Sequence, residues 1–266
     1  MTVERWRFID SGPMPGADNM ALDEAMFEAH AAGAVPPTLR VYTWRPWAVS
    51  LGRFQRVEGS VDLEACRRLG IDVVRRPTGG RAILHTAEEV TFGVVVSAAR
   101  LGTTGIMDSY RALAAAIAAG LKLLGLDARL VERRPAAGAQ PSGQDPACFA
   151  VKARCDLVVG AAKLVGSAQV QREGVILQQN SLPLRIDLTP WADVFVRSGP
   201  APEATGLWDA AHRQVLYGEV ASALRQGFAA TFAIDFEDSE PTAEEQRRAR
   251  QRREERAILD AGTSSG

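Results

Sequence analysis

The stretch KLVGSAQVQREGVILQQNSL, residues 163–182, holds two runs of strand-forming residues on either side of a short polar break. The runs Leu164–Val170 and Val175–Leu182 are rich in valine, leucine and isoleucine, and the break between them ends in glycine. A further short run of the same kind, Asp156–Val159, comes just before them. Three such runs with short breaks predict an antiparallel meander, in which consecutive strands pair.

Outside this meander, helices and strands are mixed without regular alternation. Short strands are predicted at Trp6–Ile9 and Val90–Val96, and the clearest helix is Ser109–Leu124, whose apolar residues share one face. An earlier helix is expected to begin with Asp18 or Asn19 as its N-cap. This order favours an α+β fold, with a mixed, largely antiparallel central sheet flanked by helices, over a doubly wound parallel sheet.

The composition is that of an ordinary globular protein. The chain has 266 residues, of which 46% are apolar and 24% charged, and its net charge is -1. These values exclude a disordered regulator and a disulfide miniprotein, and no basic excess points to nucleic acid. No apolar run is long enough to span a membrane, and three widely spaced cysteines do not form a disulfide framework. A cytoplasmic protein without nucleic-acid or membrane partners is therefore expected.

The second half of the chain contains a segment with little to bury and a charged end. Residues Arg133–Pro146 are mostly Pro, Ala, Gly and Gln, which predicts a mobile loop. Thr242 and Glu245 have the spacing of a capping box, and an Arg/Glu-rich helix is expected to follow them to about Ile258. We therefore expect a catalytic domain over residues 1–240 and a charged helix and tail over residues 241–266.

The segment RRPTGGR, residues 75–81, has the composition of a ligand-binding loop. Paired glycines allow close approach of the backbone, and three arginines within seven residues offer donors to phosphate or carboxylate. A glycine hairpin with solvated arginines is an equally good interpretation of the segment alone. His85, shortly after it, could be a base or a histidine at the edge of the core. No Gly-Lys-Ser/Thr follows, so this is not a Walker A loop.

Cys148 and Lys163 are the candidate reactive residues. Cys148 stands between the predicted mobile loop and the meander, where an accessible nucleophile could lie, although most free cysteines are small buried residues. If residues 156–160 and 163–169 form a hairpin, Lys163 comes close to the part of the chain that leads from Cys148 into the hairpin. Its ammonium group would then lower the pKa of the thiol; the alternative is an exposed lysine in a turn. No metal-ligand spacing is present, so no metal site is expected.

Several motifs together resemble the lipoate-protein ligase A/octanoyltransferase family, whose fold is shared with biotin-protein ligases. They are RFIDSG (7–12), NMALDE (19–24), RRPTGGRA (75–82) with His85, and KLVGSAQ (163–169). The likeness runs from the N-terminus to about residue 185 and implies a single catalytic domain of that fold. Within the family, Cys148-Phe149 before the Lys163 strand looks like the octanoyltransferases typical of Gram-positive bacteria. In those enzymes the matching cysteine carries the acyl group as a thioester, and the matching lysine makes the thiol of that cysteine more acidic.

The resemblance implies a reaction, its partners and a set of site residues. Octanoyl-acyl carrier protein would be the donor, and the acceptor would be a lipoyl-carrier protein, either the glycine cleavage H protein or a dehydrogenase lipoyl domain. No cofactor is implied. Cys148 and Lys163 would be catalytic. The substrate-binding residues would be Arg75, Arg76, Thr78, Gly79, Gly80, His85, Gly166, Ser167 and Ala168.

The sequence departs from the family pattern at two places, and two other functions stay possible alternatives. The family commonly has Gln-His-Gly-Ser where residues 178–181 read Gln-Gln-Asn-Ser, and Tyr-Ser where Phe92-Gly93 stand. These changes concern the choice of acceptor and the size of the pocket. The first rival is an ATP-dependent ligase that attaches free lipoate or a medium-chain fatty acid. The second is a non-catalytic acyl- or biotin-type binding module.

Overall fold

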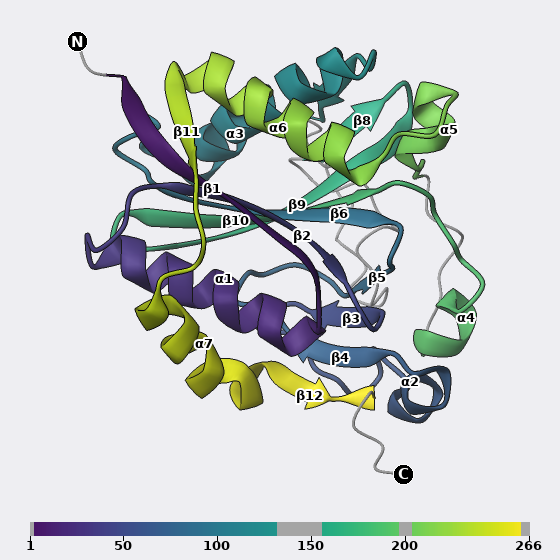
Figure 1. Ribbon diagram of the computed structural model, residues 1–266. Coiled ribbons are helices and arrows are strands. Elements are labelled where there is room, and N and C mark those ends of the chain that lie inside the picture. Colours follow the sequence, from purple (N-terminus) through teal and green to yellow (C-terminus); the bar gives the residue numbers. More distant parts are fainter. Residues whose placement is uncertain (1–2, 132–155, 197–203, 262–266) are drawn as a thin grey trace, which may run out of the picture.

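A large mixed sheet forms the centre of the computed structural model, which describes residues 3–131, 156–196 and 204–261 (Figure 1). In spatial order its strands are β11 (Ile234–Asp238), β1 (Glu4–Met14), β2 (Thr38–Trp44), β6 (Glu89–Ser97), β10 (Val175–Pro183), β9 (Ala162–Arg172), β8 (Leu157–Val159) and β7 (Ala128–Leu130). β1 pairs in parallel with β11 and β2, whereas the other neighbours are antiparallel. The predicted α+β fold with a mixed, largely antiparallel sheet is confirmed.

A smaller sheet carries the segment that leads into the glycine-rich motif. Its strands, in spatial order, are β12 (Ala257–Leu259), β4 (Asp72–Arg75), β3 (Ala48–Leu51) and β5 (Ile83–His85). Helix α1 (Gly16–Ala31) lies between the two sheets, where it packs against β6 and β10 of the large sheet and β4 of the small one (Figure 1). This arrangement buries α1 on nearly every side. The polar side chains of α1 therefore need hydrogen-bond or charge partners.

The opposite face of the large sheet is covered by two helices that pack closely together. α3 (Ile106–Leu123) and α6 (Tyr217–Phe232) cross where Gly120 meets Gly227; a Cβ added to Gly227 would lie 2.3 Å from the Gly120 nitrogen. Their apolar faces join the sheet in the largest buried cluster of the molecule. The remaining helices are α2 (Leu63–Leu69), α4 (Trp191–Val194), α5 (Leu207–Ala211) and α7 (Ala243–Arg256). Within the described residues, no helix is both long and apolar enough to span a membrane.

The predicted meander is present, and its register assigns side chains to the two faces. β8, β9 and β10 pair consecutively, with Gln179 opposite Ala168 on one side and opposite Gly93 of β6 on the other. Because side chains alternate along a strand, Gln179 points toward α1, whereas Gln178 points toward α3. Thr78 of the glycine-rich motif contacts Gln179, so this motif meets the large sheet on the face that carries α1.

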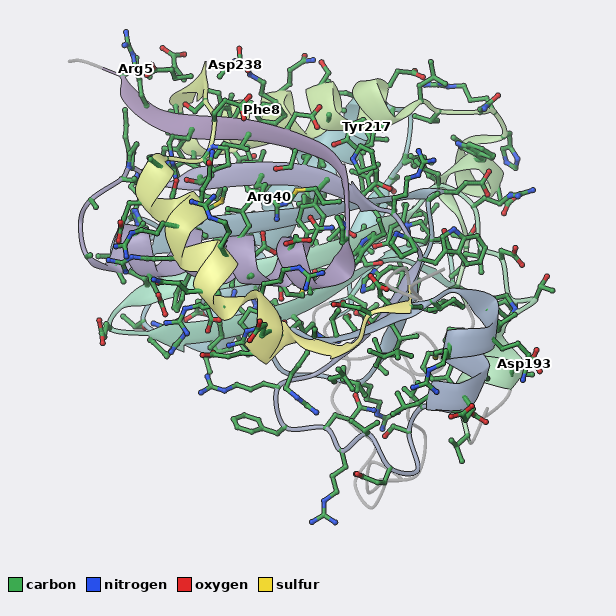
Figure 2. All side chains as sticks on the ribbon, turned by 60° about the horizontal axis from the view of Figure 1, so that its bottom comes forward. Arg5, Phe8, Arg40, Asp193, Tyr217 and Asp238 are labelled. Carbon is green, nitrogen blue, oxygen red and sulfur yellow. The ribbon has the colours of Figure 1, made fainter. Side chains whose placement is uncertain are left out.

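The expected N-cap of the first helix is wrong. α1 begins at Gly16, its N-cap is Pro15, and no side chain caps it. Asn19 instead binds Arg40 of β2: its side-chain oxygen accepts a hydrogen bond of 2.7 Å from Nη2. Arg40 lies between the sheet and α1, where Asp23 compensates its charge at 2.7 Å (Figure 2). A buried arginine thus takes the side chain that the sequence pattern assigned to capping.

The C-terminal helix begins as predicted but ends sooner. Thr242 and Glu245 form the expected capping box, and α7 ends at Arg256 rather than near Ile258. The chain then continues as β12, which pairs with β4, while α7 packs along α1 (Figure 2). The proposed division at residue 240 stays a prediction.

Candidate active site

The glycine-rich loop between β4 and β5 is organised around the buried guanidinium of Arg76. Only 3% of Arg76 is exposed. Its Nε and Nη2 donate to the Gly79 carbonyl at 3.1 and 2.7 Å, Nη2 also donates to the Arg81 carbonyl at 2.7 Å, and Nη1 donates to the Ser50 carbonyl at 2.7 Å. The loop is therefore held from inside by Arg76.

The two glycines of the loop meet different surroundings. Gly80 has φ +92°, and its carbonyl oxygen would lie 2.0 Å from a Cβ at Gly52, so the backbone of Gly52 touches the loop directly. A Cβ at Gly80 would lie 2.9 Å from Arg76 Nη2. No described atom lies within 4 Å of the position of a Cβ at Gly79. With respect to the described residues, the loop is in close contact at Gly80 and has room beside Gly79.

Thr78 connects the loop to the large sheet. Its hydroxyl donates to Gln179 Oε1 at 2.8 Å, and Gln179 Nε2 donates to Asp23 Oδ2 of α1 at 2.7 Å. The Cβ position of Gly80 lies 4.0 Å from the Cβ of Ala168 in β9. The structure thus brings Thr78, Gly80 and Ala168 together on the α1 face of the sheet.

Gly166 and Ser167 lie on opposite faces of β9. By strand alternation Gly166 shares the α1 face with Ala168. Ser167 points the other way, and its hydroxyl donates to Asn180 Oδ1 at 2.8 Å. Among the predicted binding residues of this strand, Ser167 is the one directed away from the glycine-rich loop.

Arg75 holds a neighbouring loop. Its Nη1 donates to the carbonyl oxygens of Gly52, Arg53 and Gln55 at 3.0, 3.3 and 2.7 Å. The Arg53 N–H in turn donates to the Thr78 carbonyl at 2.9 Å. Arg75 therefore joins residues 52–55 to the glycine-rich loop.

His85 is buried, and both of its ring nitrogens have hydrogen-bond partners. Nε2 lies 2.8 Å from the Ser50 hydroxyl, and Nδ1 lies 2.8 Å from Glu89 Oε1. The ring stacks on Trp44, with ring centroids 3.9 Å apart. Neither Ser50 nor Glu89 stood out in the sequence: Ser50 meets His85 through the pairing of β3 with β5, whereas Glu89 follows His85 by four residues at the start of β6.

Lys163 lies in the predicted hairpin, but it is fully buried rather than exposed in a turn. β8 and β9 pair with Val158 opposite Lys163. The Lys163 ammonium group lies 3.0 Å from Asp156 Oδ2, and the side chains are 0% and 2% exposed. A buried ammonium group requires a compensating charge, which Asp156 supplies. Sequence reasoning missed Asp156, although its place directly before β8, across the hairpin from Lys163, is the signal that could have indicated it.

Several predictions fall outside the described residues. Cys148, Phe149 and the predicted loop Arg133–Pro146 all lie in the segment 132–155. The expected approach of Lys163 to Cys148 stays a prediction. Across the described parts of the chain, no group of three or more His, Cys, Asp or Glu side chains is placed to hold a metal ion.

The two departures from the family pattern contact the same carboxylate. A Cβ at Gly93 would lie 3.2 Å from Asp23 Oδ1, and Gln179 donates to Asp23 Oδ2. Asn180 faces the other side, where its Nδ2 donates to the Phe92 carbonyl at 3.1 Å. The small residue at 93 and the amide at 179 are thus complementary to Asp23.

A separate pocket lies toward the far end of β10. Its lining is largely apolar and consists of Leu84, Thr86, Glu89, Pro183, Arg185, Ile186, Asp187, Leu188 and Trp191. None of the predicted site residues belongs to this lining. Glu89 of this lining also contacts His85, so the pocket lies next to the predicted site without containing it.

Comparison with known proteins identifies relatives over nearly the whole chain. Residues 15–229 match the family model described as the lipoyl protein ligase A/B catalytic domain. Octanoyltransferase LipM of Symbiobacterium thermophilum is 40% identical, with 92% of each chain covered, and that of Kyrpidia tusciae is 41% identical, with 94% of this chain and 95% of the relative covered. Among solved structures, a lipoate-protein ligase A bound with ATP has a TM-score of 0.79 at 28% identity, with 95% of each chain covered. A bipartite lipoate protein ligase from Thermoplasma acidophilum has a TM-score of 0.75 at 26% identity, with 100% and 99% covered.

Proposed function

Because the chain belongs to the lipoyl protein ligase A/B catalytic domain family, we propose that it is an octanoyltransferase of that family. The observation that carries this proposal is the identity of about 40%, over more than nine-tenths of the chain, with relatives named octanoyltransferase. The ligases of known structure share the fold at lower identity. We further propose that the donor is octanoyl-acyl carrier protein and that the acceptor is a lysine of a lipoyl-carrier protein.

The proposed reaction has two steps that share one nucleophile. The Cys148 thiolate attacks the donor thioester; the new carbon–sulfur bond forms on the enzyme and the carrier thiol leaves. The ε-amine of the acceptor lysine then attacks this acyl-enzyme, an amide forms, and the Cys148 thiolate leaves and is available again. The amine releases one proton to solvent in this second step, which balances the proton that the expelled carrier thiolate takes up to become a thiol. Splitting the transfer allows two large proteins to bind in turn rather than together.

Lys163 suits the proposed role because its ammonium group is held in place before any substrate binds. The ion pair with Asp156 is fully buried, and the Thr205 N–H donates to the Lys163 carbonyl at 2.9 Å, which fixes the backbone as well. A cation in a water-poor site acts more strongly on a nearby thiol or on a developing oxyanion than one in water. This arrangement supports Lys163 as the group that favours the Cys148 thiolate.

The glycine-rich loop suits the donor arm. Gly79, Gly80 and Ala168 are partly or fully exposed, and no side chain of the described residues fills the space beside Gly79, so a narrow, extended chain can lie along these small groups, while the buried Thr78 fixes the loop from below. Substituting Gly80 by Val would strain the backbone at φ +92° and press on Arg76, so loss of activity in this variant would reflect the loop itself.

The test is to weigh the enzyme and the acceptor intact after incubation with octanoyl-carrier protein, with and without ATP. Octanoyl transfer without ATP, through a transient octanoyl adduct on the enzyme, is the expected result. Cys148→Ala should lose both the adduct and the transfer. Cys66→Ala, which removes a buried cysteine of α2, should keep both and serves as the control. ATP-dependent activity in Cys148→Ala would establish the ligase instead, and octanoyl binding without any turnover would favour the binding module.

A further inference from the structure

A chain of buried hydrogen bonds connects the glycine-rich loop to a carboxylate of the large sheet. It runs from Arg76 through Ser50 of β3 and His85 of β5 to Glu89 of β6. The three residues beyond Arg76 are between 1% and 4% exposed. The chain therefore joins the two sheets directly behind the loop and is shielded from water.

The donors and acceptors in this chain have one consistent direction. The Trp44 indole donates to Thr91 Oγ1 at 2.7 Å, which commits the Thr91 proton to Glu89 Oε1. The same carboxylate oxygen accepts from His85 Nδ1. His85 Nδ1 therefore carries a proton and donates it, and in the neutral imidazole Nε2 is then an acceptor.

Ser50 completes the direction of the chain. Its hydroxyl oxygen accepts from Arg76 Nη1 at 3.1 Å, and its proton is donated to His85 Nε2 at 2.8 Å. The positive guanidinium and the negative carboxylate are thus connected through two neutral groups, and the orientation of each fixes that of the next. A protonated His85 would reverse this order, because Nε2 would then donate to Ser50.

The orientation of Arg76 determines what the loop presents to a ligand. Arg76 draws the Gly79 carbonyl toward the interior. In a trans peptide the N–H of the next residue points the opposite way, so the Gly80 N–H is directed away from Arg76. A ligand at the loop meets backbone N–H rather than carbonyl oxygen only while this orientation holds.

We propose that Ser50, His85 and Glu89 are positioning residues that hold Arg76, and through it the turn at residues 79–81, in the conformation that receives the acyl donor. His85 exchanges no proton with the substrate in this assignment. Its effect on donor binding rests on the proposed octanoyl transfer, whereas its effect on the loop conformation does not.

Three variants test the individual hydrogen bonds between Arg76, Ser50, His85 and Glu89. Ser50→Ala removes the hydroxyl, His85→Asn keeps a donor near the Nδ1 position but loses contact with Ser50, and His85→Gln keeps an acceptor near the Nε2 position. Amide hydrogen exchange at residues 79–82 should be faster than in the wild type for the first two and near the wild-type rate for His85→Gln. Ser109→Ala, which removes an equally buried hydroxyl on the α3 side of the sheet, should leave this exchange unchanged. Wild-type exchange in both Ser50→Ala and His85→Asn would overturn the proposal.

Kinetics distinguish positioning from catalysis by His85. One lost hydrogen bond behind the loop should raise the KM for the octanoyl donor by roughly 5- to 30-fold in Ser50→Ala and His85→Asn. The kcat should stay within about threefold of wild type, and His85→Gln should restore the donor KM. Loss of kcat in both His85 variants, together with loss of one limb of the pH profile, would make His85 a catalytic base and overturn the assignment. If the wild type itself transfers no octanoyl group, the proposed function fails, and the exchange rates still decide whether the chain positions the loop.

Discussion

Lys163 places a positive charge in the interior of the protein, and Asp156 places the matching negative charge beside it. Such an ion pair can contribute to the stability of the folded protein, to the catalytic reaction, or to both. A buried ion pair often contributes little net stability compared with apolar residues of similar size, whereas removal of one partner alone is strongly destabilising. The two contributions can therefore be separated by changing one residue or both.

Asp156→Ala should destabilise the protein by about 3–5 kcal/mol, because it leaves the Lys163 ammonium group buried without its carboxylate. The double variant Asp156→Leu/Lys163→Met should recover most of that stability, and it should form little octanoyl adduct. Urea unfolding measures the stability, and intact mass measures the adduct. A double variant with wild-type rates of adduct formation would leave Lys163 with a structural role alone.

Cys66 provides a contrast to Cys148 at the same scale. Burial raises the pKa of the Cys66 thiol to about 12, and Asp62 contributes in the same direction. At pH 8 roughly one Cys66 side chain in 10⁴ would be a thiolate, whereas an ordinary thiol is partly ionised there. Iodoacetamide at pH 8 should therefore modify Cys148 in the native protein and Cys66 only after unfolding, as peptide mass mapping can show. Equal rates at the two cysteines would contradict both the burial effect and the proposed nucleophile.

The residues that sequence reasoning could identify are those whose neighbours in the chain give the signal. The glycine-rich loop and Lys163 stood out because glycine pairs and a lysine in an apolar strand are unusual locally. Ser50 gave no such signal, since its partner His85 lies 35 residues away, and Glu89 and Asp156 were overlooked because carboxylates near a strand end are common. The burial of Lys163 was missed because its exposure depends on Asp156, and not on the strand that contains it.

At the scale of elements, α7 is attached through its first turn. The Thr242 hydroxyl accepts from the Glu245 N–H at 3.1 Å, and Glu245 accepts from the Thr242 N–H at 2.7 Å. Arg7 of β1 donates twice to the same carboxylate, at 3.0 and 2.6 Å. Further along, Arg252 and Arg256 reach carboxylates of α1. One carboxylate thus both begins the helix and fastens it to the central sheet.

Glu245→Gln should loosen this attachment and destabilise the protein by about 3 kcal/mol at pH 7. Burial alone would raise the pKa of Glu245, but the hydrogen bonds and charge of Arg7 outweigh it and lower that pKa. The carboxylate therefore contributes stability above the ordinary carboxyl pKa, and this contribution is lost as pH falls through the lowered value. Urea unfolding should show a difference between wild type and variant that shrinks in acid. The exposed Glu240→Gln should behave like the wild type at every pH.

Element prediction succeeded where periodicity and caps agree, and failed where tertiary contacts decide. α3 and the meander follow from side-chain periodicity, and the capping box of α7 from two residues at fixed spacing. The start of α1 was misplaced because Asn19 binds Arg40 instead of capping. β12 was missed because a three-residue strand depends on its partner β4, which lies about 180 residues earlier in the sequence.

At the scale of the whole molecule, the C-terminal segment closes the layer that contains α1. α7 packs along α1, β12 pairs with β4, and the Ala261 N–H donates to Asp72 Oδ1 at the start of β4 at 2.9 Å. β4 ends at Arg75, which leads directly into the glycine-rich loop. The end of the chain thus supports the strand from which the loop emerges, although the two are distant in sequence.

Removal of residues 241–266 should therefore affect the whole fold. The truncation breaks the Arg7–Glu245 pair and takes β12 away from β4, and loss of the pair alone corresponds to about 3 kcal/mol. For a protein of this size that loss lowers Tm by roughly 6–12 °C. Thermal unfolding followed by circular dichroism measures the shift, and a peptide of residues 241–261 added in excess should recover part of it because the docking surfaces on α1 and β4 remain. An unchanged Tm would mean that residues 1–240 are complete in themselves, and the boundary expected from the charge pattern would then mark a separable unit.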